Sequence, residues 1–241
     1  MNRHLWTNKD LNSHYPCPQC NQGSLSLDSV EDYQTYQSKK EDEEAREEGW
    51  GPYSHTQLYN FRAMLICNRC KENVLCVGEA WSSRYHEEAE NYPSYRERLQ
   101  PKCFLPSLKI IKTPKTTPRR LKEEITNSFE LFWMNESACA NSIRKVLELL
   151  MDEASIPKTG KKGGFLPLQE RIKQYSKVDQ RLLSAVKEIG NVGSHSEAAV
   201  DSVLDGYELL EHVLELLYTD KQSEYIKLAE DVIKKHSRGN K

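Results

Sequence analysis

Short stretches of alternating apolar and polar residues recur through the first part of the chain, and this period of two is typical of β-strands. It is clearest over residues 58–67 and 74–85, and residues 25–33 predict a further strand. Residues 38–48 interrupt the alternation with an acidic, helix-like insert, and the Gly-Trp-Gly-Pro sequence at 49–52 follows it as a breaker. We therefore expect a small β-sheet that carries one helical insertion.

The second part of the chain has a different period. Residues 92–118 contain five prolines and predict an extended connector. From Arg119 onwards apolar residues recur every three or four positions, which predicts helices. The first stripe is one long helix or two stacked helices joined near 135–137, and Glu136 alone interrupts its apolar positions, Ile125, Phe129, Phe132, Cys139, Ile143, Val146 and Leu150. Further helical patterns occupy residues 166–175, 178–189, 203–217 and 221–235.

Two Cys-x-x-Cys pairs lie in the β-rich part, at Cys17-Pro-Gln-Cys20 and Cys67-Asn-Arg-Cys70. Four thiolates in two such pairs are the ligand set of a closed, tetrahedral, structural zinc site. The pairs are separated by 67 − 20 − 1 = 46 residues, against roughly 15 to 20 in a compact ribbon. The sequence therefore predicts Zn²⁺ in an elaborated zinc ribbon, where the metal replaces a core that a small module cannot build.

Other roles for these residue types are open. A Cys-x-x-Cys pair can be a redox dithiol, and His14 or His55 could replace one of the thiolates. Two pairs, each beside a strand-like run, favour metal binding over redox chemistry. The remaining cysteines are expected to be small buried apolar residues: Cys76, Cys103 and Cys139.

Composition limits the function classes further. The 241-residue chain has a formal net charge of −2, so no strong overall attraction to nucleic acid is expected. No apolar run approaches the length of a membrane helix and the N-terminus lacks a signal-peptide core. Seven cysteines with metal-like spacing fit a reducing compartment, so a cytoplasmic location without a membrane partner is expected. The fold class expected is α+β: a zinc-ribbon module over 1–92, a Pro-rich basic connector over 93–118 and an all-α bundle over 119–241.

Two local segments are basic enough to contact phosphate. Residues 109–122 contain six basic residues and no acid, and residues 158–164 place Lys158, Lys161 and Lys162 beside three glycines. The alternative for each is a solvated linker or loop. The second segment lacks the full phosphate-loop pattern, so it is not interpreted as a nucleotide site.

The sharpest local pattern is Gly190-Asn191-Val192-Gly193-Ser194-His195-Ser196-Glu197. Ser194 and Glu197 form a capping box, which predicts a turn here and a helix that begins with His195. A helix N-terminus disfavours an imidazolium, so a neutral His195 could accept a proton beside Asn191. The alternative is a structural turn in which both side chains satisfy neighbouring backbone groups.

The helical half contains two patterns, Ser137-Ala138-x-Ala140-x-x-x-Arg144-x-x-Leu147-Glu148 and Gly190-Asn191-x-Gly193-x-His195. With these patterns, roughly residues 118–218 resemble a bacterial domain-of-unknown-function family of HEPN-like type. In that family a zinc ribbon and a Pro-rich connector often precede the domain. The resemblance implies an α-helical bundle that forms a homodimer, and many such domains are metal-independent ribonucleases in toxin–antitoxin, CRISPR and anti-phage systems.

The chain departs from the family motif at one position. The HEPN nuclease motif begins with Arg, and Gly190 stands in its place. A ribonuclease of this class needs a cation to stabilise the phosphorane charge, which Arg144 or Lys187 would have to supply. The sequence thus supports a non-catalytic module that binds RNA, DNA or a partner protein in a defence system. The alternatives are an endoribonuclease with His195 as general acid/base and Asn191 positioning phosphate, or a subunit of a larger defence assembly.

Overall fold

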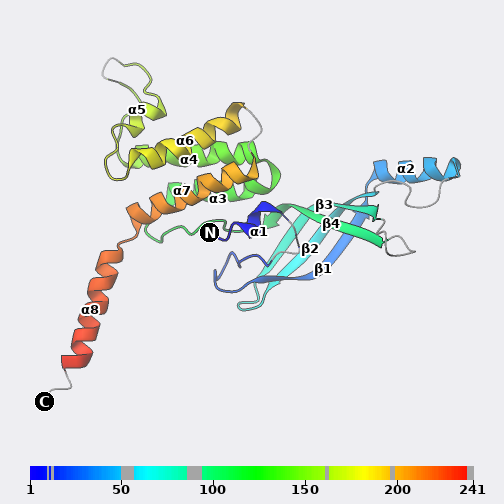
Figure 1. The fold of residues 1–241 in the computed structure, drawn as a ribbon, viewed down its shortest axis with the longest axis horizontal. Helices are drawn as coiled ribbons and strands as arrows, with labels where there is room; N and C mark the ends of the chain where they lie inside the picture. The colour runs from blue at the N-terminus through cyan, green and yellow to red at the C-terminus, as the bar shows by residue number, and fades with distance from the viewer. Residues whose placement is uncertain are drawn as a thin grey trace.

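The computed structural model describes residues 1–9, 11, 14–49, 57–85, 94–160, 163–195 and 199–237. A β-sheet with one helix beyond its far end forms one half of the molecule, and the helices that follow residue 118 form the other (Figure 1). The fold is therefore α+β, with the sheet N-terminal as the change in hydrophobic period predicts. None of the helices in these ranges has the length and apolar composition needed to cross a bilayer.

The sheet is antiparallel, with strand order β1-β2-β3-β4. Its strands are β1 (Leu25–Gln34), β2 (Gln57–Cys67), β3 (Asn73–Tyr85) and β4 (Ser94–Leu105). The first three strands confirm the alternation seen at 25–33, 58–67 and 74–85. Helix α2 (Tyr36–Glu47) confirms the acidic helical insert, and Gly49, with φ of 82°, follows its end. The remainder of the expected breaker, 50–52, lies outside the described residues.

Strand β4 corrects the expectation of a connector over 93–118, because residues 94–105 pair with β3 along their whole length. The prolines misled the prediction for a physical reason. Pro101 lies on an edge strand beside a register shift at Val77/Gly78, and a missing N–H is tolerated at such places. The extended link between the sheet and the helices is therefore residues 106–118, and this segment is called the connector below.

The helical half contains α3 (Arg119–Met134), α4 (Glu136–Glu153), α5 (Leu168–Ile172), α6 (Gln180–His195), α7 (Val200–Tyr218) and α8 (Lys221–Ser237). The predicted joint between α3 and α4 is confirmed, because the Asn135 side chain caps α4 by accepting a hydrogen bond from the Ala138 amide at 2.8 Å. Helices α3, α4, α6 and α7 pack on one another, whereas α8 projects from the body (Figure 1).

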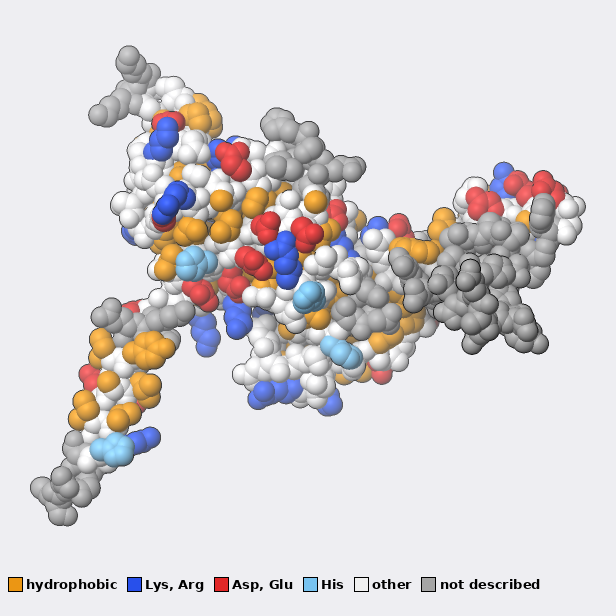
Figure 2. Space-filling model, viewed as in Figure 1, with side chains coloured by type: hydrophobic (Ala, Val, Ile, Leu, Met, Phe, Trp, Pro, Cys, Tyr) orange, Lys and Arg blue, Asp and Glu red, His pale blue; other side chains and the backbone are white. Residues whose placement is uncertain are grey.

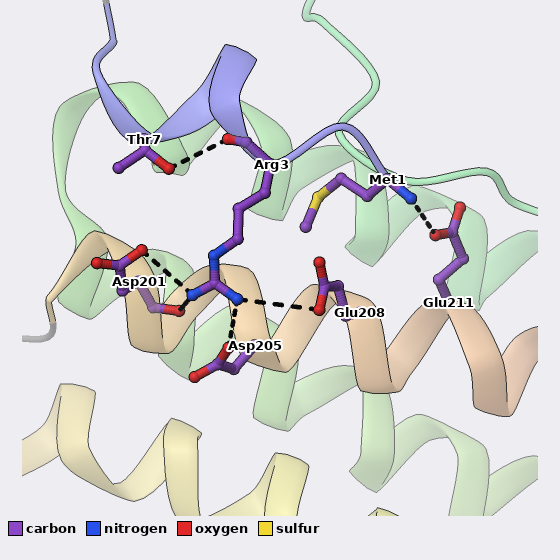
Figure 3. Close-up of polar contacts among 7 residues, drawn as sticks. All are labelled: Met1, Arg3, Thr7, Asp201, Asp205, Glu208 and Glu211. Atoms are coloured by element: carbon purple, nitrogen blue, oxygen red, sulfur yellow. Dashed lines mark hydrogen bonds and ion pairs between the residues drawn. The ribbon is translucent and has the colours of Figure 1, made fainter.

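The N-terminal segment joins the two halves. Helix α1 (His4–Thr7) buries Trp6 against Trp133 of α3, with ring centroids 6.2 Å apart. Trp133 in turn packs on Phe104 of β4 at 4.6 Å, so aromatic rings from the sheet and the helices share one core. Before α1, the Arg3 guanidinium lies over α7 and pairs with three acidic residues, Asp201, Asp205 and Glu208 (Figure 3).

Lys9 forms a buried contact between the same two halves. Its side chain is 8% exposed, and its ammonium group donates to the Phe132 carbonyl at 2.6 Å and to the Glu136 carboxylate at 2.5 Å. Partial burial opposes ionisation of Glu136, but the hydrogen bond from Lys9 still brings the pKa of that carboxyl below its usual range. The pair therefore attaches the N-terminal segment to the α3–α4 joint.

We predict that Lys9→Met lowers the free energy of unfolding by about 2 kcal/mol, because Glu136 and the Phe132 carbonyl lose their partner in a partly dry site. Lys40→Met is the control, since the exposed pair of Lys40 with Glu44 should contribute less than about 0.5 kcal/mol. Urea unfolding at pH 7 measures both. Since the pKa of Glu136 is lowered on folding, its contribution is present at neutral pH and is lost below about pH 4. Equal losses in the two variants would contradict this role.

Candidate metal centre and the α4–α6 helix pair

The two Cys-x-x-Cys segments have the same backbone form. Each first cysteine donates its amide across its own turn, Cys17 to the Gly23 carbonyl and Cys67 to the Glu72 carbonyl, both at 2.9 Å. Each second cysteine is followed by a residue with positive φ, Asn21 at 53° and Lys71 at 62°. We call these turns the first knuckle, which contains Cys17 and Cys20, and the second knuckle, which contains Cys67 and Cys70. The first knuckle precedes β1 and the second joins β2 to β3, so the pairing of β1 with β2 brings the two knuckles together.

The four sulfurs of these knuckles form one cluster. All four ligand atoms lie within 4.8 Å of one another, and the Cys17–Cys70 and Cys20–Cys67 sulfurs are 3.6 and 3.8 Å apart. A tetrahedron with metal–sulfur bonds of about 2.3 Å has edges of about 3.8 Å, so this set fits a tetrahedral thiophilic ion. The structure thus brings together all four predicted ligands.

Backbone amides point at the sulfurs and favour their charged form. Gly23 donates to the Cys20 sulfur at 3.3 Å, and the amides of Arg69 and Cys70 donate to the Cys67 sulfur at 3.4 and 3.5 Å. Amides of Gln22 and Gly23 lower the pKa of Cys20 to about 6. At Cys70 an amide also favours the thiolate, but desolvation and the neighbouring sulfurs raise its pKa to about 12. Four thiolates this close therefore need a cation to balance them.

The two knuckles pack closely together and supply four ligand atoms, the full number for a tetrahedral metal. A Cβ at Gly23 would lie 2.5 Å from the Cys67 sulfur and 2.8 Å from the Asn68 side-chain oxygen, so only glycine fits there. The metal site would thus be structural rather than catalytic. His14 is not a member of the cluster, and His55 lies outside the described residues. Of the other cysteines, Cys76 and Cys139 are buried and Cys103 is half-buried.

The second candidate site differs from its prediction. Helix α6 continues through Gly190 and ends at His195, and α7 begins at Val200, so the expected turn and the helix start at His195 are wrong. His195 occupies the last position of a helix, and the argument from a helix N-terminus for its neutral form no longer applies. Its side chain and Glu197 lie outside the described residues.

Gly190 has a packing role that explains why it is glycine. A Cβ at this position would overlap the Cβ of Arg144 and lie 3.1 Å from the Ala140 carbonyl oxygen. The glycine therefore allows α6 to cross α4 at close range, in the way small residues do at tight helix contacts. The position that Gly190 occupies in the sequence motif therefore lies at a helix–helix contact, which an Arg side chain there would disrupt.

This crossing does bring Arg144 to Asn191. The Arg144 guanidinium donates to the Asn191 side-chain oxygen, and its Nε lies 3.6 Å from the Glu148 carboxylate. Asn191 donates in turn to Glu188 at 3.0 Å, and Lys187 pairs with the same carboxylate at 2.5 Å. Lys187, and then Asn191, hold the pKa of Glu188 below its usual range, so its side chain is ionised at neutral pH.

Sequence reasoning missed a further feature, a cleft of about 1090 Å³ at the junction of the two halves. Part of the basic segment 109–122 lines it, and so do the loops of both knuckles. Only the run of lysines signalled this surface in the sequence. The other basic segment is less available, since Lys158 pairs with Asp152 at 2.8 Å and Lys161 and Lys162 lie outside the described residues.

We predict that Cys67→Ser releases the bound metal and unfolds the N-terminal module, because it removes one of four ligands. Cys103→Ser is the matched control, since Cys103 lies outside the cluster and is also partly covered. Metal analysis of the purified proteins, together with thermal unfolding, measures the effect. Undiminished metal in Cys67→Ser would refute the ligand assignment.

We also predict that Gly190→Ala destabilises the helical half by about 1–2 kcal/mol. Overpacking the α4–α6 crossing should outweigh the gain of about 1 kcal/mol in helix propensity. Gly164→Ala serves as control, because a Cβ there would meet nothing within 4 Å. Denaturant unfolding distinguishes the two, and a stabilised Gly190→Ala protein would contradict the close crossing.

Comparison with known families divides the chain in two. Residues 6–104 match the model of a family described as Domain of unknown function (DUF8608), and residues 126–238 match a second one, Domain of unknown function (DUF4145). None of the curated proteins and none of the solved structures matches the chain. Both halves are thus similar to families whose function is unassigned.

Proposed function

We propose that this chain is a zinc-binding, non-catalytic module that binds nucleic acid, with a helical half of HEPN-like type. Four thiolates in a tetrahedral arrangement that leaves no open coordination position favour zinc. Such a zinc ion has a structural role, so the function depends on the surface that the two folded halves present.

The observation that carries the proposal is the distribution of available cations. Arg144 is hydrogen-bonded to Asn191 and lies against Glu148, and Lys187 pairs with Glu188. By contrast, the exposed ammonium groups of three connector lysines have no carboxylate partner among the described residues: Lys109, Lys112 and Lys115. Phosphate is attracted to uncompensated cations, so this distribution favours binding at the connector over binding at the helix pair.

A ribonuclease is the second candidate, and one observation favours it. The α4–α6 crossing brings Arg144 to Asn191, one helical turn before His195 along α6. In that hypothesis His195 acts as general acid/base, Asn191 positions the phosphate and Arg144 stabilises the charge of the phosphorane. Glu148 and Glu188 count against it, because two carboxylates beside the guanidinium repel a phosphodiester.

The proposal includes a homodimer through the helical half and a role in a prokaryotic defence system, where a protein of that system is a further candidate partner. The defence role follows from the resemblance to HEPN-like domains. Support for dimerisation comes from α8, whose apolar side chains face solvent (Figure 2), with Tyr225 70% and Ile233 64% exposed. An apolar helix face of this kind normally packs against another surface.

The test combines binding and cleavage on labelled single-stranded RNA, tRNA and single-stranded DNA without added divalent metal. We expect salt-dependent binding by the wild type and no cleavage, with His195→Ala binding equally well. Cleavage lost in both His195→Ala and Arg144→Ala would establish the ribonuclease instead. If the zinc-loaded wild type binds none of these three nucleic acids, the proposal of nucleic-acid binding is wrong.

A further inference from the structure

We propose that a single strand of nucleic acid lies in the cleft at the junction, between the connector lysines and the first zinc knuckle. This inference rests on the proposed function and assigns it a site. The cleft of about 1090 Å³ is bounded by the N-terminal segment, both knuckle loops, the connector and one face each of α3 and α7. It therefore exists only where the two halves are assembled.

One wall supplies positive charge. Lys109, Lys112, Lys115 and Lys122 line the cleft, against two glutamates of α7, Glu211 and Glu215. Lys122 donates to the Lys115 carbonyl at 2.6 Å, which holds its ammonium group against the connector. The other three are exposed and unpaired among the described residues, at every third position of the segment. Repeated cations along one wall fit repeated phosphates, which a polymer supplies and a mononucleotide does not.

One of the two glutamates, Glu211, is already engaged by groups of the cleft wall. The Glu211 carboxylate accepts the backbone amide of Lys112 at 2.7 Å and also lies 3.4 Å from the Met1 ammonium group. Its charge is thus directed at groups of the cleft wall rather than at the open space. The contact also holds the connector against α7, so the lysines on it have a defined backbone position.

The knuckle loops that line the cleft offer hydrogen-bonding groups that suit bases. Asn21 and Gln22 of the first knuckle are exposed, and amide side chains both donate and accept. Asn68 of the second knuckle is already held by Ser24, donating to its hydroxyl and accepting from its amide. A concave wall of this kind can reach base edges only when the bases are unpaired, because in a duplex they lie at the bottom of grooves.

The test uses full-length, zinc-loaded protein and fluorescence anisotropy of a labelled single-stranded oligonucleotide over a range of salt concentrations. We expect the triple variant Lys109→Gln, Lys112→Gln, Lys115→Gln to bind at least tenfold more weakly. Its slope of log affinity against log salt should fall by about 2, since each phosphate contact on a single strand contributes about 0.7. Gln22→Glu should also weaken binding.

The control variant changes three exposed lysines of α8, Lys227→Gln, Lys234→Gln and Lys235→Gln, with the same change in net charge. It should keep the wild-type slope. Equal effects of the two triple variants would overturn the cleft while leaving nucleic-acid binding intact, and absence of wild-type binding would overturn the proposed function itself. If ATP competes as strongly as the unlabelled oligonucleotide, the cleft binds phosphate groups but not a strand, which would contradict the proposal. Tighter binding of a duplex than of the single strand would contradict single-strand recognition.

Discussion

Four cysteine sulfurs within 4.8 Å of one another set the geometry on which the N-terminal half depends. They join two turns that lie 46 residues apart, at the ends where β1 and β2 pair through Leu25 and Cys67. Because such a cluster of thiolates is unstable without a cation, we expect metal binding and sheet formation to be coupled. On this account, the knuckle loops that border the cleft have a fixed shape only with a metal bound.

The sheet half packs on the helices through a shared core at the junction. Trp6, Phe104 and Trp133 form one aromatic cluster from α1, β4 and α3, and Lys9 ties the N-terminal segment to the start of α4. The sheet and the bundle are thus parts of one folded body with a shared core. On the proposed function, the ligand contacts both the knuckles and the connector, so its binding would require an intact body and would depend indirectly on the metal.

Much of this could be predicted from the sequence, because it depends on local patterns. Periods of two and of three to four residues located β1 to β3 and most of the helices. Cysteine spacing identified the four cysteines that cluster, and Asn135 marked the joint between α3 and α4. Strand β4 was missed because Pro101 resembles a connector residue until its edge position is known. Gly190 was misassigned because a glycine for close helix packing and a glycine for a turn look alike. The cleft arises from tertiary assembly, so no local pattern could describe it.

The central claim is that a zinc ion bound by Cys17, Cys20, Cys67 and Cys70 organises the N-terminal half. Zinc K-edge X-ray absorption of the purified full-length protein tests it most directly, because it reports the identity and distance of the ligand atoms. The account predicts one zinc per chain with four sulfur neighbours at about 2.3 Å. A first shell that contains nitrogen or oxygen, or protein that is folded and free of metal, would contradict it.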